Sequence, residues 1–427
     1  MNQVTDQQII EILRKEAVPA LGCTEPVACA LACAKCKEVL GDVPEHLDVL
    51  VSGNIYKNGM GVGIPGTGMV GLPIAAALGA VCGKSEYGLE VLKEVNVGDN
   101  LQRAKDMLGQ VKVSLKEDAP DKLYAEALAT KGNDTVKVII VHTHTNIVLV
   151  EKNGKEIFKR EFRLDTSKPE DKGPELSVKR IWDFVHQVDV KDIEFVLQGA
   201  EMNKAISAEG LNSEYGLQIG KTLKENIDKG LLEDDLLNRT LIRATAASDA
   251  RMDGCPKPVM TNSGSGNQGI TVYLPVVVAA EQFGASREQL ARALALSNLI
   301  AVHIHYYMGH LSALCGILIA GTGAASAITY LMGGKYEQVS YAVKNMIANL
   351  TGMICDGAKP SCALKLTSGV STAVLSAMLA MQQKCVSSVE GIIDDDVDKS
   401  IHNLTSIGAE AMNETDRKVL EIMTHKS

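Results

Sequence analysis

Three cysteines offer the clearest chemistry in this sequence. Cys355 and Cys362 are separated by six residues, and Cys315 lies forty residues upstream of the first of them. The spacer contains Gly357 and Pro360, which favour a turn over a helix, so that two thiolates can be directed at one metal. Three cysteines near turns, with no obvious fourth, suggest an iron–sulfur cluster with one iron open to substrate. The alternative is three buried thiols, because free cysteine is among the most buried residue types.

Cys23 is a further reactive candidate, because it directly precedes a predicted helix at residues 25–40 that Thr24 is expected to cap. The dipole and the free N–H groups of a helix N-terminus stabilise a thiolate, so we expect the pKa of Cys23 to be lowered. A thiolate at this position could act as a base, a nucleophile or a ligand. The alternative is a small buried residue in a turn between helices.

A loop rich in glycine and polar residues, TNSGSGNQG at 261–269, offers a second kind of chemistry. Its backbone N–H groups are of the kind that cradles an anion, and pyridoxal-phosphate enzymes use a similar Ser-x-Gly-Asn loop for the substrate carboxylate. The alternative is an ordinary turn, but the density of polar residues favours ligand contact. The candidate substrate-binding residues in this loop are Ser263, Ser265, Asn267 and Gln268.

The segment GVGIPG at 61–66 matches a dinucleotide fingerprint by its letters alone. Pro65 and the glycines after it continue a loop rather than begin a helix, so the structural context of that fingerprint is missing. We interpret the segment as a mobile or closely packed loop beside a ligand. Asn54, Lys57 and Asn58, just upstream, are then candidate polar contacts to that ligand.

Two further groups of metal-binding residue types are discounted by their spacing. Cysteines 29, 33 and 36 have the spacing of the radical-SAM cluster motif, which requires an extended loop. Here they fall in a strong helix pattern, where they form one stripe of small residues against the core. The histidines at 303, 305 and 310 are close in sequence, but 303 and 305 point in different directions on a helix. We therefore expect one of these histidines in the site, and not all three.

The composition is that of an ordinary globular protein of 427 residues, with 46% hydrophobic and 22% charged residues. A net charge of −9 without a basic cluster argues against nucleic-acid binding. Ten cysteines and the lack of an apolar N-terminal signal favour a reducing, cytoplasmic location. Two uncharged stretches, 58–83 and 311–334, are long enough to span a bilayer. They are rich in glycine and alanine, so we interpret them as buried elements and expect no membrane partner.

The order of patterns along the chain predicts an α+β fold, with a mainly helical catalytic domain and a smaller mixed domain inserted near the N-terminus. An amphipathic helix at 6–18, begun by a Thr5/Gln8 capping box, is followed by strand patterns and the tight-turn signal Asn153-Gly154. A charged linker is expected at 169–174. The predicted domains are 1–45 (two helices packing with the catalytic domain), 46–170 (small α+β domain) and 171–427 (helical, cluster-binding). The predicted strands are 47–52, 111–115, 136–142, 146–151 and 155–162.

These pieces together resemble the L-cysteine desulfidase family, within the iron–sulfur serine dehydratase α-chain group. The resemblance rests on GCTEP at 22–26, NGMGVGIPGT at 58–67, SGSGNQG at 263–269 and the cysteine trio. It implies a [4Fe–4S] cluster bound by Cys315, Cys355 and Cys362, with Cys23 as the active-site thiol. In serine-specific relatives the last two ligands stand further apart, so the short spacing here favours cysteine as substrate.

The resemblance implies an α,β-elimination that converts L-cysteine to pyruvate, ammonia and hydrogen sulfide, with Cys23 as the candidate base. The expected partner is a small amino acid, and a homo-oligomer is expected. L-Serine remains an alternative substrate. Two other hypotheses are a pyridoxal-phosphate lyase, which needs a Schiff-base lysine, and a non-enzymatic iron–sulfur sensor, which needs a partner-binding or DNA-binding module.

Overall fold

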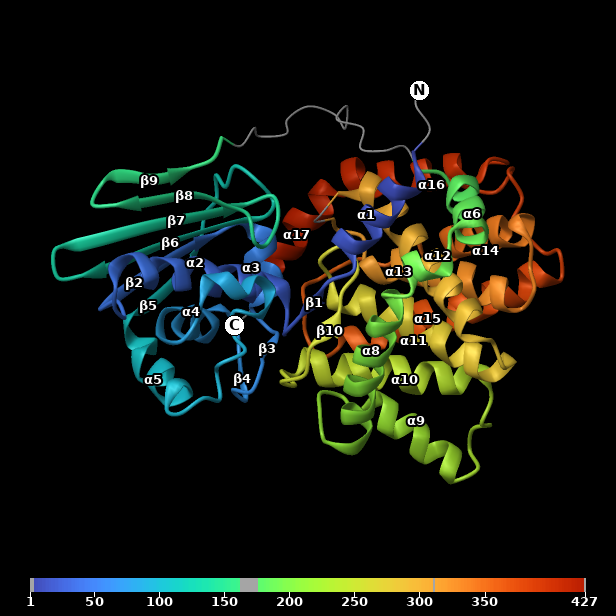
Figure 1. Cartoon of the computed structure of the whole chain (residues 1–427), viewed down its shortest axis with the longest axis horizontal. Coiled ribbons are helices and arrows are strands. Elements are labelled where there is room, and N and C mark those ends of the chain that lie inside the picture. Colours follow the sequence, from blue (N-terminus) through green and yellow to red (C-terminus); the bar gives the residue numbers. More distant parts are fainter. Residues whose placement is uncertain (1–3, 162–175, 310–311, 426–427) are drawn as a thin grey trace.

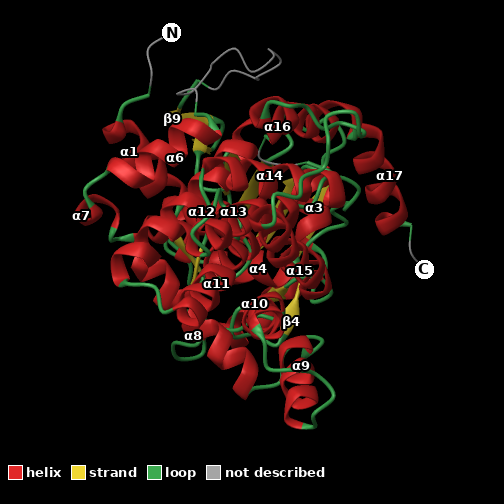
Figure 2. Cartoon of the chain, turned by 90° about the vertical axis from the view of Figure 1, so that its right-hand side faces the viewer, coloured by secondary structure: helices red, strands yellow, loops and turns green. Residues whose placement is uncertain are grey.

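The chain folds into a sheet-containing part and a larger helical part that lie side by side (Figure 1). The computed structural model describes residues 4–161, 176–309 and 312–425, so the predicted linker at 169–174 and His310 lie outside the described residues. The predicted α+β class, mainly helical with a smaller mixed sheet, is confirmed. Seen from the side of the helical part, helices dominate the molecule (Figure 2).

A six-stranded mixed sheet organises the sheet-containing part. Its strands are β2 (His46–Val51), β5 (Val111–Leu115), β6 (Tyr124–Lys131), β7 (Asp134–Val141), β8 (Ile147–Lys152) and β9 (Lys155–Lys159). Their order is β5-β2-β6-β7-β8-β9, in which β2 and β5 run parallel and the other neighbours are antiparallel. The predicted tight turn joins β8 to β9, and both Asn153 and Gly154 have positive φ, as such a hairpin requires.

Two helices, α2 (Thr24–Leu40) and α4 (Leu72–Val81), pack together and cover one face of this sheet. Their backbones approach closely, since a Cβ on Gly79 would lie 2.1 Å from the Ala30 carbonyl oxygen. Small side chains on α2 permit this approach, and its cysteines 29, 33 and 36 are fully buried in the core. The helical spacing had predicted this packing stripe.

The first two helices pack on different parts of the molecule, whereas both were expected to pack with the helical part. α1 (Asp6–Glu16) buries Ile9, Ile10 and Leu13 in the core of the helical part, and its predicted capping box is present. α2 instead belongs to the core around the sheet. The physical reason is that α1 has one apolar face, whereas α2 is apolar around most of its circumference and needs cover on several sides.

The helical part is built around α13 (Gly316–Leu331), a buried helix that other helices surround. Those in contact with it include α11 (Gly266–Phe283), α12 (Arg287–Met308), α14 (Tyr336–Leu350) and α15 (Cys362–Met381). The outer helices are α6 (Val178–Gln187), α7 (Val190–Ile193), α8 (Val196–Asn212), α9 (Ile219–Asp228), α10 (Leu236–Met252) and α16 (Val397–Ser406). The last helix, α17 (Asn413–Thr424), returns to contact α3 (Gly53–Gly59) beside the sheet, and α5 (Asn100–Met107) packs on α4.

Two short ribbons place loops where the two parts meet. β1 (Pro19–Ala20) pairs with β10 (Val259–Met260), which brings the chain before α2 beside the loop at 261–265. The GVGIPG segment forms a hairpin of β3 (Gly63–Ile64) and β4 (Met69–Val70) and begins no helix. A Cβ on Gly63 would lie 2.4 Å from the backbone of Asp253, so this hairpin is closely packed, one of the two expectations for it.

Among the described residues, α15 is the one helix long and apolar enough to cross a membrane, and half of its most apolar window is buried inside the protein. The core helix of a folded protein has the same composition. The two uncharged stretches noted in the sequence instead supply α4 and α13, with 10 and 16 residues. Both helices are buried almost throughout, so their interpretation as buried elements is confirmed.

Candidate active site

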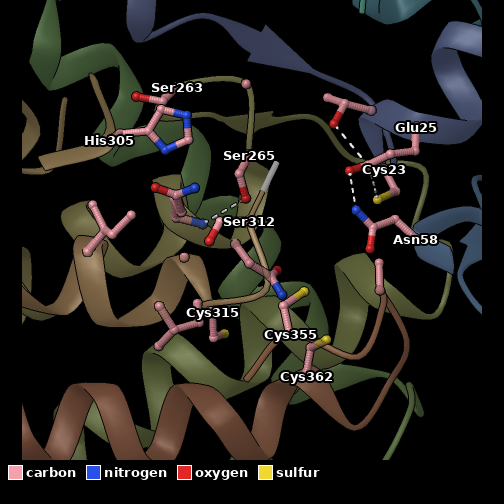
Figure 3. A pocket seen from close by; sticks show the side chains of 18 of the residues that line it. Cys23, Glu25, Asn58, Ser263, Ser265, His305, Ser312, Cys315, Cys355 and Cys362 are labelled. Atoms are coloured by element: carbon pink, nitrogen blue, oxygen red, sulfur yellow. Dashed lines mark hydrogen bonds between the residues drawn. The ribbon is translucent and has the colours of Figure 1, made fainter. Parts of the chain in front are cut away.

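A cavity of about 150 Å³ lies where the sheet-containing part meets the helical part (Figure 3). The sheet-containing part contributes Cys23, Glu25, Asn58 and His144 to its wall. The helical part contributes the three cysteines singled out in the sequence and the whole polar loop at 263–268 apart from Gly266. The structure therefore brings together, in one cavity, most of the residues that the sequence nominated separately.

The three cysteines reach the cavity from two segments that are held together by backbone hydrogen bonds. The Cys315 N–H donates to the Met353 carbonyl at 2.9 Å, and the Cys355 N–H donates to the Ala313 carbonyl at 2.7 Å. Cys315 then begins α13, and Cys362 begins α15. Their sulfurs face the same region of the cavity (Figure 3). This arrangement fixes the relative position of two of the thiols through main-chain contacts alone.

The loop between the last two cysteines requires glycine at one position. Gly357 has a φ of +91°, and a Cβ there would lie 2.4 Å from the Lys57 carbonyl oxygen. Within the same loop Asp356 forms ion pairs with Lys359, at 2.7 Å, and with Lys365. Although burial raises the pKa of Asp356, these two lysines lower it to about 2. The loop is therefore held by a charged cluster on one side and by α3 on the other.

The donor set fits an iron–sulfur cluster in ligand type, and its three cysteines line one cavity. Burial, with repulsion from Cys355, raises the pKa of Cys315 to about 12, and burial raises the pKa of Cys362. Such thiols lose their protons when a metal binds, and soft thiolate ligands select iron–sulfur clusters or zinc. Within the described ranges no three His, Cys, Asp or Glu side chains converge closely enough for one metal ion. A cluster places each cysteine on a different iron, so its ligands lie further apart.

Cys23 occupies the N-cap of α2, directly beside the residue that orients it. Its Sγ donates a hydrogen bond to Glu25 Oε2 at 3.0 Å, and Asn58 Nδ2 donates to Glu25 Oε1 at 2.9 Å. Burial, and then the Glu25 carboxylate, raise the pKa of Cys23 well above its usual range. The expectation of a lowered pKa was therefore wrong, because burial of the thiol outweighs the helix dipole. Cys23, and not Thr24, is the cap residue.

Glu25 holds the negative charge that Cys23 was expected to hold. Burial raises the pKa of this carboxyl, but the charge of His144 and the hydrogen bonds from Cys23 and Asn58 outweigh it, so the net shift is downward. Thr24 Oγ1 donates a further hydrogen bond at 3.3 Å. The site thus contains a neutral thiol that donates a hydrogen bond to a buried carboxylate.

The polar loop turns into α11 with backbone geometry suited to ligand contact. Ser263 and Gly264 have φ values of +49° and +76°, and Ser265 caps the helix by accepting from the Gln268 N–H at 3.4 Å. The loop is fastened to the chain that leads to Cys23, because the Ser263 N–H donates to the Glu16 carbonyl at 3.0 Å. Four predicted side chains of this loop line the cavity: Ser263, Ser265, Asn267 and Gln268.

Of the three polar residues nominated around α3, only Asn58 lines this cavity. Asn54 and Lys57 turn the other way and bind Asp416 of α17, at 2.7 and 2.5 Å. Lys57 Nζ also lies 3.5 Å from the Cys355 carbonyl oxygen. Both side chains therefore contact the C-terminal helix, and Lys57 also contacts the back of the cysteine loop.

The histidines at 303 and 305 point apart, as their spacing on a helix predicts. His303 Nε2 lies 2.8 Å from Asp398 Oδ1 on α16, away from the cavity. His305 lines the cavity and is labelled in Figure 3. Residue 310 lies outside the described residues, so its expectation stays a prediction.

Four residues of the cavity wall with ionisable side chains were missed in the sequence: Glu25, His144, Arg251 and Lys365. Glu25 belongs to the GCTEP motif, and its closeness to Cys23 in the sequence could have identified it as a candidate site residue. His144 lies in the turn between β7 and β8, and the strands predicted at 136–142 and 146–151 flank this turn. Arg251 has no motif around it, so nothing in the local sequence marked it.

Known proteins match this chain over most of its length. The chain belongs to the serine dehydratase alpha chain family, whose model matches residues 86–421. A UPF0597 protein of Parabacteroides distasonis is 52% identical over 433 residues, which cover 100% of both chains. UPF0597 proteins of Phocaeicola vulgatus and Bacteroides thetaiotaomicron are 53% and 51% identical, and each alignment covers 98% of both chains.

The range that the family model matches includes only part of the cavity wall. Residues 86–421 include the polar loop and the three cysteines but begin after Cys23, Glu25 and Asn58. The full-length relatives align over those three positions as well as over the rest of the chain. The thiol–carboxylate pair therefore lies in the segment that the family model does not describe.

Proposed function

We propose that this protein is an iron–sulfur lyase that degrades L-cysteine by α,β-elimination. With one water, L-cysteine gives pyruvate, ammonia and hydrogen sulfide, so the reaction is balanced without a redox partner. The observation that carries the proposal is that three cysteines on one wall of a cavity face a thiol–carboxylate pair on another. When bound to Cys315, Cys355 and Cys362, a [4Fe–4S] cluster would supply a Lewis-acidic iron.

The residues of the chain account for the proton transfer. Glu25 takes the proton of Cys23 along the existing 3.0 Å hydrogen bond as the Cys23 sulfur takes the Cα proton of the substrate, so that no free buried thiolate is formed. Burial increases the affinity of the Cys23 sulfur for a proton, because the same desolvation that raises the pKa of the thiol disfavours its thiolate. Ser263, Ser265, Asn267 and Gln268 supply polar contacts that orient the amino acid. Asn58 holds Glu25 in place through its amide N–H.

A second candidate is L-serine dehydration by the same residues, with water as the leaving group. It is supported by the description of the matched family, serine dehydratase alpha chain. The thiol–carboxylate pair lies outside the matched range and gives no preference between the two substrates. Comparing the two amino acids in one assay decides between them.

The test is anaerobic iron–sulfide reconstitution of the wild type, of Cys355→Ala and of a control, Cys385→Ala. Cys385 is half-buried and lies outside the cavity, so its loss should leave iron binding unchanged. We expect the wild type and the control to bind iron, show cluster absorbance, and release equal amounts of sulfide and pyruvate from L-cysteine. Cys355→Ala should lose the cluster and both products.

Other outcomes separate the alternatives. A cluster that turns over only L-serine would establish the dehydratase, and a cluster without any turnover would indicate a sensor. A discrete absorbance band that survives air would indicate pyridoxal phosphate instead. Absence of iron binding after reconstitution would contradict the proposal and leave the three cysteines as packing residues.

A further inference from the structure

Arg251, near the C-terminal end of α10, places a buried positive charge in the wall of the cavity. Its side chain is only 4% exposed. Its hydrogen-bond partners among the described residues are neutral: its guanidinium donates to the Gly22 carbonyl at 3.0 Å and to Asn267 Oδ1 at 3.2 Å, and lies 3.2 Å from the Met252 sulfur. Among the described residues, no carboxylate forms an ion pair with it. Buried charges in proteins are normally paired, so this cation is suited to an anionic ligand.

The guanidinium lies directly against the polar loop that faces the ligand. A Cβ on Gly266 would lie 2.1 Å from Arg251 Nε and 2.5 Å from its Cζ. Glycine at 266 therefore leaves the space that this flat group occupies. Arg251 Nε has no hydrogen-bond partner among the described residues. The packing of the loop therefore fixes the position of the Arg251 guanidinium.

Two unpartnered acceptors line the same cavity. Asn58 Oδ1 and Gln268 Oε1 are buried and have no hydrogen-bond partner within the described part of the chain. The amide of Asn58 is oriented by its donation to Glu25, which leaves its oxygen as the free end. A cavity that offers a cation and two unsatisfied acceptors complements a zwitterion, with a carboxylate at one end and an ammonium at the other.

Arg251 also lies beside the segment that carries the proposed base. It donates to the carbonyl of Gly22, the residue directly before Cys23, and its charge acts on the Cys23 thiol. A substrate carboxylate bound by Arg251 would therefore bring the adjacent Cα to the Cys23 side of the cavity.

We propose that Arg251 binds the α-carboxylate of the amino-acid substrate, and that Asn58 Oδ1, on the Cys23 side of the cavity, receives its ammonium group. This inference rests on the proposed reaction of an α-amino acid, and it assigns to the Arg251 guanidinium the selection of substrates that carry an α-carboxylate. It makes Arg251 a specificity-determining residue: amines without a carboxylate, such as cysteamine, are rejected although they carry the same thiol.

The first test uses the wild-type, iron-reconstituted protein and two ligands that cannot eliminate a leaving group. L-Alanine carries the carboxylate, and L-alaninamide replaces it with a neutral amide while keeping the ammonium. We expect calorimetric titration to show at least about 30-fold tighter binding of L-alanine, the scale of losing one partner of a buried charge pair. Equal affinities, or no binding of either ligand, would overturn the inference without any mutation.

The second test compares Arg251→Gln and Arg251→Lys with Arg243→Gln, a control two turns earlier on the same helix and outside the cavity. Arg251→Gln should lose the preference for L-alanine over its amide, and its KM for L-cysteine should rise by at least about 30-fold. Arg251→Lys should keep part of the preference, since lysine retains the charge but not the planar fork. The control should match the wild type.

The outcomes separate this inference from the proposed function. If L-cysteine is degraded but Arg251→Gln keeps the acid preference, the inference fails and the lyase stands. If neither L-cysteine nor L-serine is degraded but the acid preference is present and lost in Arg251→Gln, the lyase fails and the carboxylate site stands. Should Arg251→Gln not fold, as judged by its circular dichroism, Arg251→Lys and the wild-type comparison decide.

Discussion

Glu25 is a buried carboxylate that several hydrogen-bond donors stabilise. It accepts from the Cys23 thiol, the Thr24 hydroxyl and the Asn58 amide, and the nearby His144 adds a favourable charge. Each of these donors favours the ionised form. At the residue scale, these contacts hold a buried negative charge beside the thiol that we propose as the base.

Replacing Glu25 by glutamine therefore tests the proton transfer directly. The amide is nearly isosteric but cannot accept the thiol proton, so we expect kcat for sulfide release to fall by about 10²- to 10⁴-fold. KM should change much less, because the amino acid does not bind through this group. Steady-state kinetics would show the split, with Glu38→Gln, on the exposed far end of α2, as the control. An unchanged kcat would exclude Glu25 as the proton acceptor.

Residue type and spacing were sufficient to find the thiols and the polar loop. Glu25 and Arg251 were missed for a physical reason: an acid in the first turn and a base in the last turn of a helix are its ordinary dipole partners. Their functional surroundings come from packing between distant elements. Asn54 and Lys57 were nominated for their closeness to a loop in sequence, whereas their partner, Asp416, lies more than 350 residues away.

At the scale of elements, one helix start depends on a carboxylate from a neighbouring helix. α9 begins after Gln218, which has a φ of +53° and provides no side-chain cap. Asp249 of α10 supplies the cap instead: its Oδ2 accepts from the N–H groups of Ile219 and Gly220, at 2.7 and 3.3 Å. Its other oxygen has no partner among the described residues, and burial raises its pKa from 3.8 to about 6.

This raised pKa predicts a specific pH dependence of stability. The folded state retains the Asp249 proton up to about pH 6, whereas the unfolded chain releases it near pH 3.8. The contribution of this group is therefore fully present below pH 3.8 and is lost as pH rises to about 6. The asparagine in Asp249→Asn does not titrate. As the pH rises between these two values, the urea midpoint of this variant should therefore increase relative to that of the wild type.

The matched control for this measurement is Asp228→Asn at the other end of α9. Asp228 is exposed and pairs only with Lys224 at the surface, so its difference from the wild type should stay nearly constant with pH. A constant difference for Asp249→Asn as well would contradict the assignment of a raised pKa to this cap.

Element patterns predicted the hairpins and the long helices but not every strand. The strand β6 reads YAEALATK, in which alanine, glutamate and leucine favour a helix. It is extended because Ala125, Ala127 and Ala129 lie buried in the core shared with α2, where larger side chains would keep the helix away. Tertiary packing thus outweighed local propensity, which no reading of that segment alone would show.

At the scale of the whole molecule, the C-terminal helix fastens the helical part to the sheet-containing part. Lys57 of α3 is 2% exposed and its ammonium group lies 2.5 Å from Asp416 of α17. The same ammonium group lies against the Cys355 carbonyl. A buried ion pair therefore sits behind the cysteine loop and connects three segments that are remote in sequence.

Breaking this pair should weaken the whole assembly. Asp416→Ala leaves the Lys57 charge buried without its carboxylate, and we expect the free energy of unfolding to fall by about 3–5 kcal/mol. Hydrogen exchange should show the loss first in α17. Arg417→Gln is the control, since its pairing with Glu414 is exposed and contributes little. A fall of the same size in the control would mean that the buried pair has no special role.

The burial of Cys23 has a consequence for the chemical durability of the protein. The proposed substrate is itself a thiol, and its oxidised form, cystine, exchanges disulfides with protein thiolates. Only the thiolate form of a cysteine attacks a disulfide. Cys23 is 5% exposed, its pKa is raised, and its S–H group donates a hydrogen bond to Glu25, so it is held in the thiol form. Free cystine therefore meets almost no nucleophile at this position. Cys23 is therefore protected from mixed-disulfide formation with the oxidised form of the compound that the protein is proposed to degrade.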